Sequence, residues 1–262
     1  MLRNANQLKG LSIHATDGEL GTASEFYFDD ESWTIRYLRV NTGGWLGGKE
    51  VLVSPYSVLR TNFDARRVDV ALTKKQVENS PNIDTRQPVS RQHEASYLNY
   101  YNYPYYWGGS SLWGEGYYPS GLAVQALSSQ NARLEESADS HLRSTDAVAG
   151  YHIEAIDGEI GAVNGFIFDD EAWSIRYIEA VTRNWWPGKD VLFSPAWIKQ
   201  VSWAESKVYV GLTREAIKSC PEYLESRAIT RDYENAVYLH YGRPPYWLGQ
   251  EDRKSSFALT AV

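Results

Sequence analysis

The chain has 262 residues, of which 43% are hydrophobic and 23% are charged, a balance that predicts a soluble globular protein. Its formal net charge of -7 argues against a general nucleic-acid binder, which needs clustered lysine and arginine. No apolar run reaches the length of a transmembrane helix and the first residues lack the apolar core of a signal peptide, so we expect a cytoplasmic protein. Cys220 is the only cysteine, which excludes an internal disulfide and a cysteine-based zinc site.

The first element in chain order is a β-hairpin around Asp17-Gly18, a dipeptide that favours tight turns between strands. Strand-forming aromatic and β-branched residues then surround the polar turn 30–32. This pattern predicts a second hairpin over residues 25–40.

A short strand is predicted at 50–55, where Pro55 ends it, and another tight strand pair over 59–72. Thr73 and Gln76 have the spacing of a capping box, which predicts one short helix near the end of the unit. We therefore expect about six short antiparallel strands that close into a small β-barrel, because closure removes exposed strand edges.

An aromatic segment follows at residues 97–118, with eight tyrosines and two tryptophans but no lysine or arginine. Without basic residues, stacking on nucleic-acid bases is disfavoured. A protein-contact surface and an arm folded over the chain's own barrels are both consistent with the pattern, and the sequence leaves them open.

The chain then repeats itself, because an offset of 140 aligns residues 10–81 with 150–221 without a gap. The phrase FDDESWTIRY at 28–37 returns as FDDEAWSIRY at 168–177, and DGELG returns as DGEIG. Beyond these cores we expect the register to slip by one residue into two similar tails. The chain is thus predicted to be a tandem duplication that forms an intramolecular pseudo-dimer.

Six segments follow from this comparison. They are a first barrel at 8–82, a first helical and aromatic tail at 83–127, a polar linker at 128–146, a second barrel at 147–222, a second tail at 223–252 and a frayed end at 253–262.

The retained turns and strands, from DGELG and FDDESWTIRY to VLVSP, resemble the PRC-barrel family. That family includes the cytoplasmic barrel of the photosynthetic reaction-centre H subunit and the C-terminal domain of a bacterial ribosome-maturation factor. The tails are similar to those of bacterial tandem PRC-barrel proteins. The resemblance implies two small barrels in tandem and, by analogy, contact with a photosynthetic or membrane complex. It implies no particular activity, because the matching motifs are turns and strands.

Arg36 and Arg176 lie inside strands with apolar neighbours, so each charge needs a partner. We expect structural ion pairs with carboxylates kept in both copies, such as Asp17 or Glu19, and a ligand-anchoring role remains the alternative. The residues predicted to be structural are Asp17, Gly18, Arg36, Asp157, Gly158 and Arg176.

The repeated acidic turns give two further interpretations. Carboxylates at Asp29, Asp30, Asp169 and Asp170 would suit calcium or magnesium, which bind several oxygen ligands. The alternating acidic positions and central glycine of an EF-hand loop are missing, however, and a solvated hairpin turn explains the same residues. We therefore expect no metal and no other cofactor, and keep a sensor of small ligands or divalent metals as the alternative function.

None of the five histidines has a histidine at its counterpart position; His14, for example, aligns with Glu154, and His93 with Tyr233. The chain also lacks a glycine-rich phosphate loop, a nucleophile elbow and a HExxH motif. We therefore predict that the protein is not an enzyme.

Each tail should contain a helix that begins after Ser90 or Thr230 and carries an exposed Arg–Glu pair three residues apart.

Together the features of the sequence predict a non-catalytic interaction or adaptor protein that binds a protein partner; an RNA- or ribosome-associated factor is the second alternative. The identity of the partner, peripheral contact with a membrane complex and any link to photosynthesis stay open. The candidate partner-binding residues are Trp45, Tyr105, Tyr106, Trp107, Trp113, Trp185, Trp186, Tyr246 and Trp247.

Overall fold

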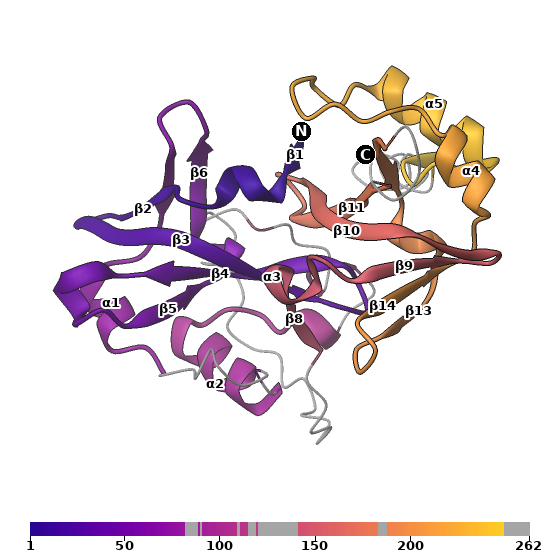
Figure 1. Ribbon diagram of the computed structural model, residues 1–262. Helices are drawn as coiled ribbons and strands as arrows, with labels where there is room; N and C mark the ends of the chain where they lie inside the picture. The colour runs from indigo at the N-terminus through magenta and orange to yellow at the C-terminus, as the bar shows by residue number, and fades with distance from the viewer. Residues whose placement is uncertain are drawn as a thin grey trace, which may run out of the picture. The chain divides into compact units, whose positions relative to one another are not determined.

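The computed structural model describes residues 1–81, 89, 91–108, 111–114, 119, 141–182 and 188–248, and the fold is mainly β, as predicted (Figure 1). The first copy contains β2 (Ser12–Ala15), β3 (Gly18–Asp29), β4 (Thr34–Asn41), β5 (Glu50–Val53), β6 (Val58–Asn62) and β7 (Arg67–Val70). The second contains β9 (His152–Ala155), β10 (Gly158–Asp169), β11 (Ser174–Val181), β12 (Asp190–Phe193), β13 (Ile198–Ser202) and β14 (Lys207–Val210). The short strands β1 (Leu2–Asn4) and β8 (Leu142–Ser144) precede the two copies.

The helices are short, apart from one in each tail. The α-helices are α1 (Lys74–Glu78), α2 (Arg91–Tyr101), α3 (Thr145–Val148), α4 (Arg214–Ser219) and α5 (Arg231–Tyr241). Single 3-10 turns occur at η1 (Ala5–Leu8), η2 (Gly43–Leu46), η3 (Pro55–Ser57), η4 (Tyr106–Gly108) and η6 (Pro195–Trp197). The tail helices α2 and α5 keep the offset of 140 residues, so the expected one-residue slip is wrong.

The strands in the described part of the chain form one mixed, fourteen-stranded sheet. Its hydrogen-bonded path runs β13-β14-β9-β10-β11-β4-β3-β2-β7-β6, with β1, β5, β8 and β12 attached beside it. The path has two ends, so the sheet does not close in the way the predicted barrels require. Nor is it wholly antiparallel, because β2 pairs with β7 in parallel and β9 does the same with β14.

The chain divides into two compact units with an interleaved boundary. The first unit comprises Met1–Gly150 and Gly165–Ile178, and the second comprises Tyr151–Asn164 and Glu179–Val262. The predicted polar linker falls largely outside the described residues, except that its end forms β8 and the start of α3. The predicted frayed end at 253–262 lies wholly outside them.

Within the first unit, leading strands are exchanged between the two copies. Strand β1, which precedes the first copy, pairs with β10 of the second, with Leu2 opposite Asp169. Strand β8, which precedes the second copy, pairs with β3 of the first, with Leu142 opposite Asp29. These registers are equivalent under the 140-residue offset. Strands β3 and β10 are twelve residues long, so each has room for two antiparallel neighbours on the same edge.

The repeated ten-residue phrase forms the turn of the β3–β4 hairpin and of its counterpart in the second copy. Asp29 accepts hydrogen bonds from the backbone N–H groups of Glu31 (3.0 Å) and Ser32 (3.1 Å). Trp33 and Trp173 both adopt a positive φ, 52° and 55°. The Ile35 N–H donates to the Trp173 carbonyl (2.8 Å), and the Ile175 N–H donates to that of Trp33 (2.7 Å). The phrase therefore encodes both a turn and a contact between the copies.

The Asp-Gly hairpins also hold the short helices. Asp17 accepts a hydrogen bond from the backbone N–H of Lys74 at 2.8 Å, and Asp157 does the same for Arg214 at 2.7 Å. Each aspartate thus satisfies an N–H group in the first turn of α1 or α4, where helical partners are lacking. The predicted capping box of Thr73 and Gln76 is present.

Candidate interaction site

Arg36 lies at the centre of a buried cluster in the first unit. Its guanidinium pairs with Asp29 at 3.3 Å, and the two side chains are only 2% and 5% exposed. It also donates to the Leu112 carbonyl at 2.6 Å and to Ser32 Oγ at 3.0 Å. The ion-pair partner of Arg36 is therefore Asp29, and not Asp17 or Glu19 as predicted. Asp17 instead accepts a hydrogen bond from the backbone N–H of Lys74 at the start of α1. Arg176 forms the equivalent pair with Asp169 at 3.5 Å.

The described part of the aromatic segment packs largely on the chain itself. Arg36 stacks on the rings of Tyr106 and Trp113, with its Cζ atom 3.7 Å and 4.7 Å from their centroids. The Trp113 indole N–H donates to the Ala172 carbonyl at 2.8 Å, and the Tyr56 hydroxyl donates to the Trp113 carbonyl at 3.2 Å. Tyr106 and Trp113 are 4% and 1% exposed, so in this fold neither offers the partner-binding surface predicted for it.

Helix α2 lies beside strand β5 in Figure 1 and brings a carboxyl group into the same cluster. Glu94 is 1% exposed and accepts hydrogen bonds from the hydroxyls of Tyr106 and Tyr37, the latter at 3.3 Å. Arg91 pairs with Glu94 at 3.4 Å and donates to the Tyr106 hydroxyl at 2.8 Å. Burial raises the pKa of Glu94 to about 7. The Arg–Glu pair was predicted, but its carboxylate is buried and not exposed.

In the second unit, tail 2 repeats part of this arrangement. Arg231 pairs with Glu234 at 2.9 Å, and the Tyr246 hydroxyl donates to Glu234 at 3.0 Å. The Arg231 Cζ atom lies 3.9 Å from the Trp247 ring centroid. In tail 1, Arg91 lies over Trp107 in the same manner at 4.6 Å. An arginine-backed tryptophan therefore occurs at matched positions of both tails.

The other aromatic candidates differ in accessibility. Tyr105, Trp107, Tyr246 and Trp247 are partly exposed, and Tyr105 stacks on Trp107 with 4.7 Å between ring centroids. Trp45 is also partly exposed; its indole N–H donates to the Leu20 carbonyl at 2.6 Å, and the Lys74 ammonium lies 4.5 Å from its ring centroid. Trp185 and Trp186 lie outside the described residues.

The four aspartates of the acidic turns form ion pairs. Besides the Asp29 and Asp169 pairs, Asp30 binds Arg143 at 2.7 Å, and Asp170 binds Arg3 at 3.4 Å. Among the residues that the structure describes, no group of three or more histidine, cysteine, aspartate or glutamate side chains is arranged to hold a metal ion. These carboxylates serve as charge partners for arginines, some of them distant in the sequence.

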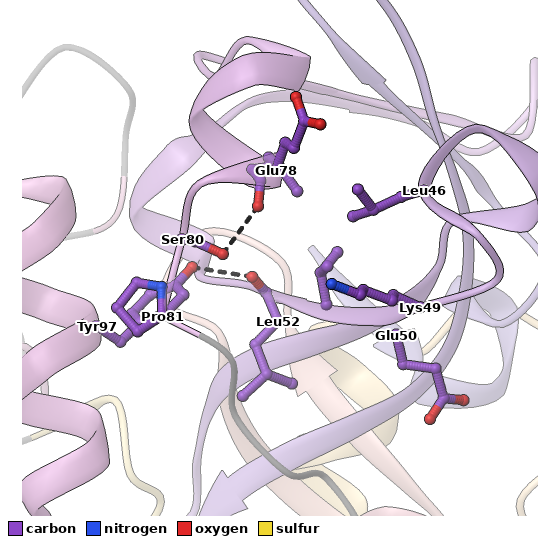
Figure 2. Close-up of a pocket in the computed structure, with 10 residues that line it drawn as sticks. Leu46, Lys49, Glu50, Leu52, Glu78, Ser80, Pro81 and Tyr97 are labelled. Carbon is purple, nitrogen blue, oxygen red and sulfur yellow. Dashed lines mark hydrogen bonds between the residues drawn. The ribbon is translucent and has the colours of Figure 1, made fainter.

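A small pocket lies beside β5, between the η2 segment and the end of α1 (Figure 2). Tyr97 reaches it from α2, and its hydroxyl donates to the Leu52 carbonyl and accepts from the Ser54 N–H, both at 3.1 Å. The Ser80 hydroxyl donates to the Val77 carbonyl at 2.9 Å. These polar groups are thus already satisfied by the chain, and Tyr97 attaches helix α2 to the sheet. The lining residues are Leu46, Lys49, Glu50, Val51, Leu52, Val77, Glu78, Ser80, Pro81 and Tyr97.

Cys220 is buried in the second unit, and burial raises its pKa to about 11 from an ordinary value of 9.0. Because the thiolate is the reactive form, we expect Cys220 to react with an aromatic disulfide reagent at least about a hundredfold more slowly in the folded protein than in denaturant. Absorbance of the released thiolate measures both rates. A folded-state rate equal to that in denaturant would contradict this assignment of Cys220 as a packing residue.

Within the described residues, no helix has both the length and the apolar character needed to cross a bilayer.

None of the curated proteins matches the chain. Residues 2–77 match the family model of the PRC-barrel domain, and this range contains β2 to β7 together with most of α1. The match confirms, over residues 2–77, the similarity to the PRC-barrel domain family that the turns and strands of this segment implied.

Proposed function

We propose that the chain is a non-catalytic interaction protein of the cytoplasm that binds a protein partner through the partly exposed aromatic residues of its tails. The supporting observation is the arginine-backed tryptophan that recurs as Arg91–Trp107 and Arg231–Trp247. Tryptophan, tyrosine and arginine are enriched among residues that contribute most to protein binding. A tryptophan ring held by a guanidinium is also ordered before binding, so less entropy is lost on association.

We further infer that the second copy is a second PRC-barrel-like module and that the two copies form an intramolecular pseudo-dimer. Every strand from β2 to β7 has a counterpart from β9 to β14, and the parallel contact of Ser12 with Arg67 returns as that of His152 with Lys207. The reciprocal exchange of β1 and β8 supports the pseudo-dimer, because an isologous interface repeats each contact in the opposite sense.

The function can be tested by replacing Trp107 and Trp247 together with alanine in the tagged full-length chain. Proteins captured from a native lysate of the source cells are then quantified by mass spectrometry and compared with those captured by the unchanged chain. We expect recovery of the specific partner to fall at least about tenfold, because removing a hot-spot residue costs more than about 1.4 kcal/mol.

Leu59→Ser is the matched control, since Leu59 lies on β6, is 51% exposed and is outside both tails. This variant should recover the partner as well as the unchanged chain does. Circular dichroism of all three proteins establishes that each is folded. Equal recovery by the double tryptophan variant would overturn the assignment of the tails as the binding surface.

A further inference from the structure

Strands β1 and β8 occupy matched positions on the long strands of the opposite copy. Both consist of leucine, arginine and a polar residue, at positions 2–4 and 142–144. The arginine of β1 lies opposite Phe168 on β10, and the arginine of β8 lies opposite Phe28 on β3. The two leading strands are therefore one repeated element, which each copy donates to the other.

The second aspartate of each acidic turn contacts the arginine of the added strand. Asp30 binds the Arg143 Nε atom at 2.7 Å, and its backbone N–H donates to the His141 carbonyl at 2.9 Å. Asp170 binds Arg3 in the same way, at 3.4 Å. The Asp30 side chain is only 12% exposed, so a strand that brought no positive charge would leave its carboxylate poorly compensated. The acidic turn therefore favours a strand with arginine at its second position.

Burial and a further hydrogen bond also hold β8 on β3. Leu142 is 3% exposed, and Val148 of the following α3, which contacts β3 as well, is 1% exposed. Ser144 donates to the Glu25 carboxylate of β3. Main-chain pairing, an apolar anchor and a charge pair are the features by which an extended segment is recognised at a sheet edge. The edges of β3 and β10 thus have the properties of strand-acceptor sites.

Donor and acceptor are joined only through a long connection. Residues 120–140, which precede β8, lie outside the described residues. A connection of this length gives the two copies of one chain an effective concentration on the order of millimolar. The same strand from a second molecule makes the same contacts, so it competes as the protein concentration approaches that value.

We propose that the edges of β3 and β10 beside the acidic turns are acceptor sites for a leucine–arginine strand, and that two molecules of this chain exchange these strands to form a homodimer. The first copy of each molecule then pairs with the second copy of the other, and the contacts of β1 and β8 are all kept. Asp30 and Asp170 determine which strand is accepted. The exchange uses neither Trp107 nor Trp247, so it and the proposed function can fail separately.

Charge reversal at one acceptor site distinguishes exchange between molecules from pairing within one molecule. One full-length chain carries Asp30→Arg and another carries Arg143→Asp, so each has like charges at its own β3 site. The two are unfolded in urea, mixed and refolded at about 50 μM, below the effective concentration of the linked copies. Exchange restores an arginine–aspartate pair at both β3 sites, so at least about half of the protein should form a mixed dimer.

Size-exclusion chromatography with light scattering measures the dimer, and native mass spectrometry establishes that it contains both variants. Each variant refolded alone should remain largely monomeric, because exchange with its own kind restores no pair. The chain with both substitutions is the matched control, since it restores the pair within one molecule and should also be monomeric. A mixture with no more dimer than the separate variants would overturn the exchange, and equal dimer formation by the doubly substituted chain would overturn the role of Asp30.

Should a charge-reversed variant fail to fold, the unchanged chain provides a second test. Unlabelled and isotope-labelled molecules are unfolded, mixed, refolded at concentrations from about 1 μM to about 1 mM and examined by native mass spectrometry. Dimers that contain one molecule of each kind should be rare at the lowest concentration and should approach about half of all dimers, in a largely dimeric sample, at the highest. Absence of such dimers over the whole range would overturn the proposal.

Discussion

Replacing Arg36 by methionine should lower the free energy of unfolding by about 3–5 kcal/mol, the usual effect of removing one member of a buried ion pair. The partner carboxylate, Asp29, is only 5% exposed, so water cannot readily take the place of the guanidinium. The Leu112 carbonyl and the Ser32 hydroxyl would also lose their donor. Urea denaturation followed by far-UV circular dichroism would show the loss as a lower midpoint.

The duplication supplies the matched control at Arg176. This side chain is 11% exposed and its partner Asp169 is 24% exposed, so water can partly solvate the carboxylate after substitution. Arg176→Met should therefore cost only about 1–2 kcal/mol. Equal losses at the two positions would show that burial of the pair does not determine its contribution.

Replacing Gly21 by alanine should destabilise the fold by about 3 kcal/mol or more. Gly21 has a φ of +146°, and a Cβ atom built on it would lie 2.0 Å from the Asn41 carbonyl oxygen on β4. Such a distance is far below van der Waals contact, so one of the two strands would have to move. This requirement explains the second glycine of DGELG. The same holds for Gly161 of DGEIG, because a Cβ atom built on it would lie 2.1 Å from the Val181 carbonyl oxygen. Thermal unfolding measures the effect as a lower Tm.

Gly44→Ala is the control for this prediction. Apart from Gly44 itself and its immediate backbone surroundings, no atom of the described residues lies within 4 Å of the position that a Cβ would occupy there, and Gly44 does not have a positive φ. The substitution should change the free energy of unfolding by no more than about 0.5 kcal/mol. A loss at Gly44 as large as that at Gly21 would point to a general sensitivity to alanine, and not to the strand contact.

The candidate site was only partly predictable from the sequence. The Arg91–Glu94 spacing predicts the ion pair, but not the burial of its carboxylate. One signal was available: Glu94 shares the i, i+3, i+4, i+7 face of its helix with Tyr97, Leu98 and Tyr101, all of them buried. A carboxylate on an apolar helix face indicates a buried partner, and this is how Glu94 could have been found.

The sequence by itself determined the features that depend on near neighbours. Only contacts within a few residues are needed for the Asp-Gly turns, the Thr73 cap and the hairpin turn that ends at Trp33. Because the same features recur after 140 positions, the sequence alone indicated a repeated domain. Residues 2–77 accordingly match the PRC-barrel family.

Only the tertiary structure decided which elements and side chains contact each other when several partners are available or lie far apart in the sequence. The pairing of β1 with β10, the insertion of Trp113 between Arg36 and Ala172, and the choice of Asp29 as the partner of Arg36 depend on how elements pack. Side-chain alternation does not specify these contacts, because β4 is buried on both faces and gives no preference between them. Burial, and with it the charge behaviour of Glu94, arises only when the tail covers the sheet.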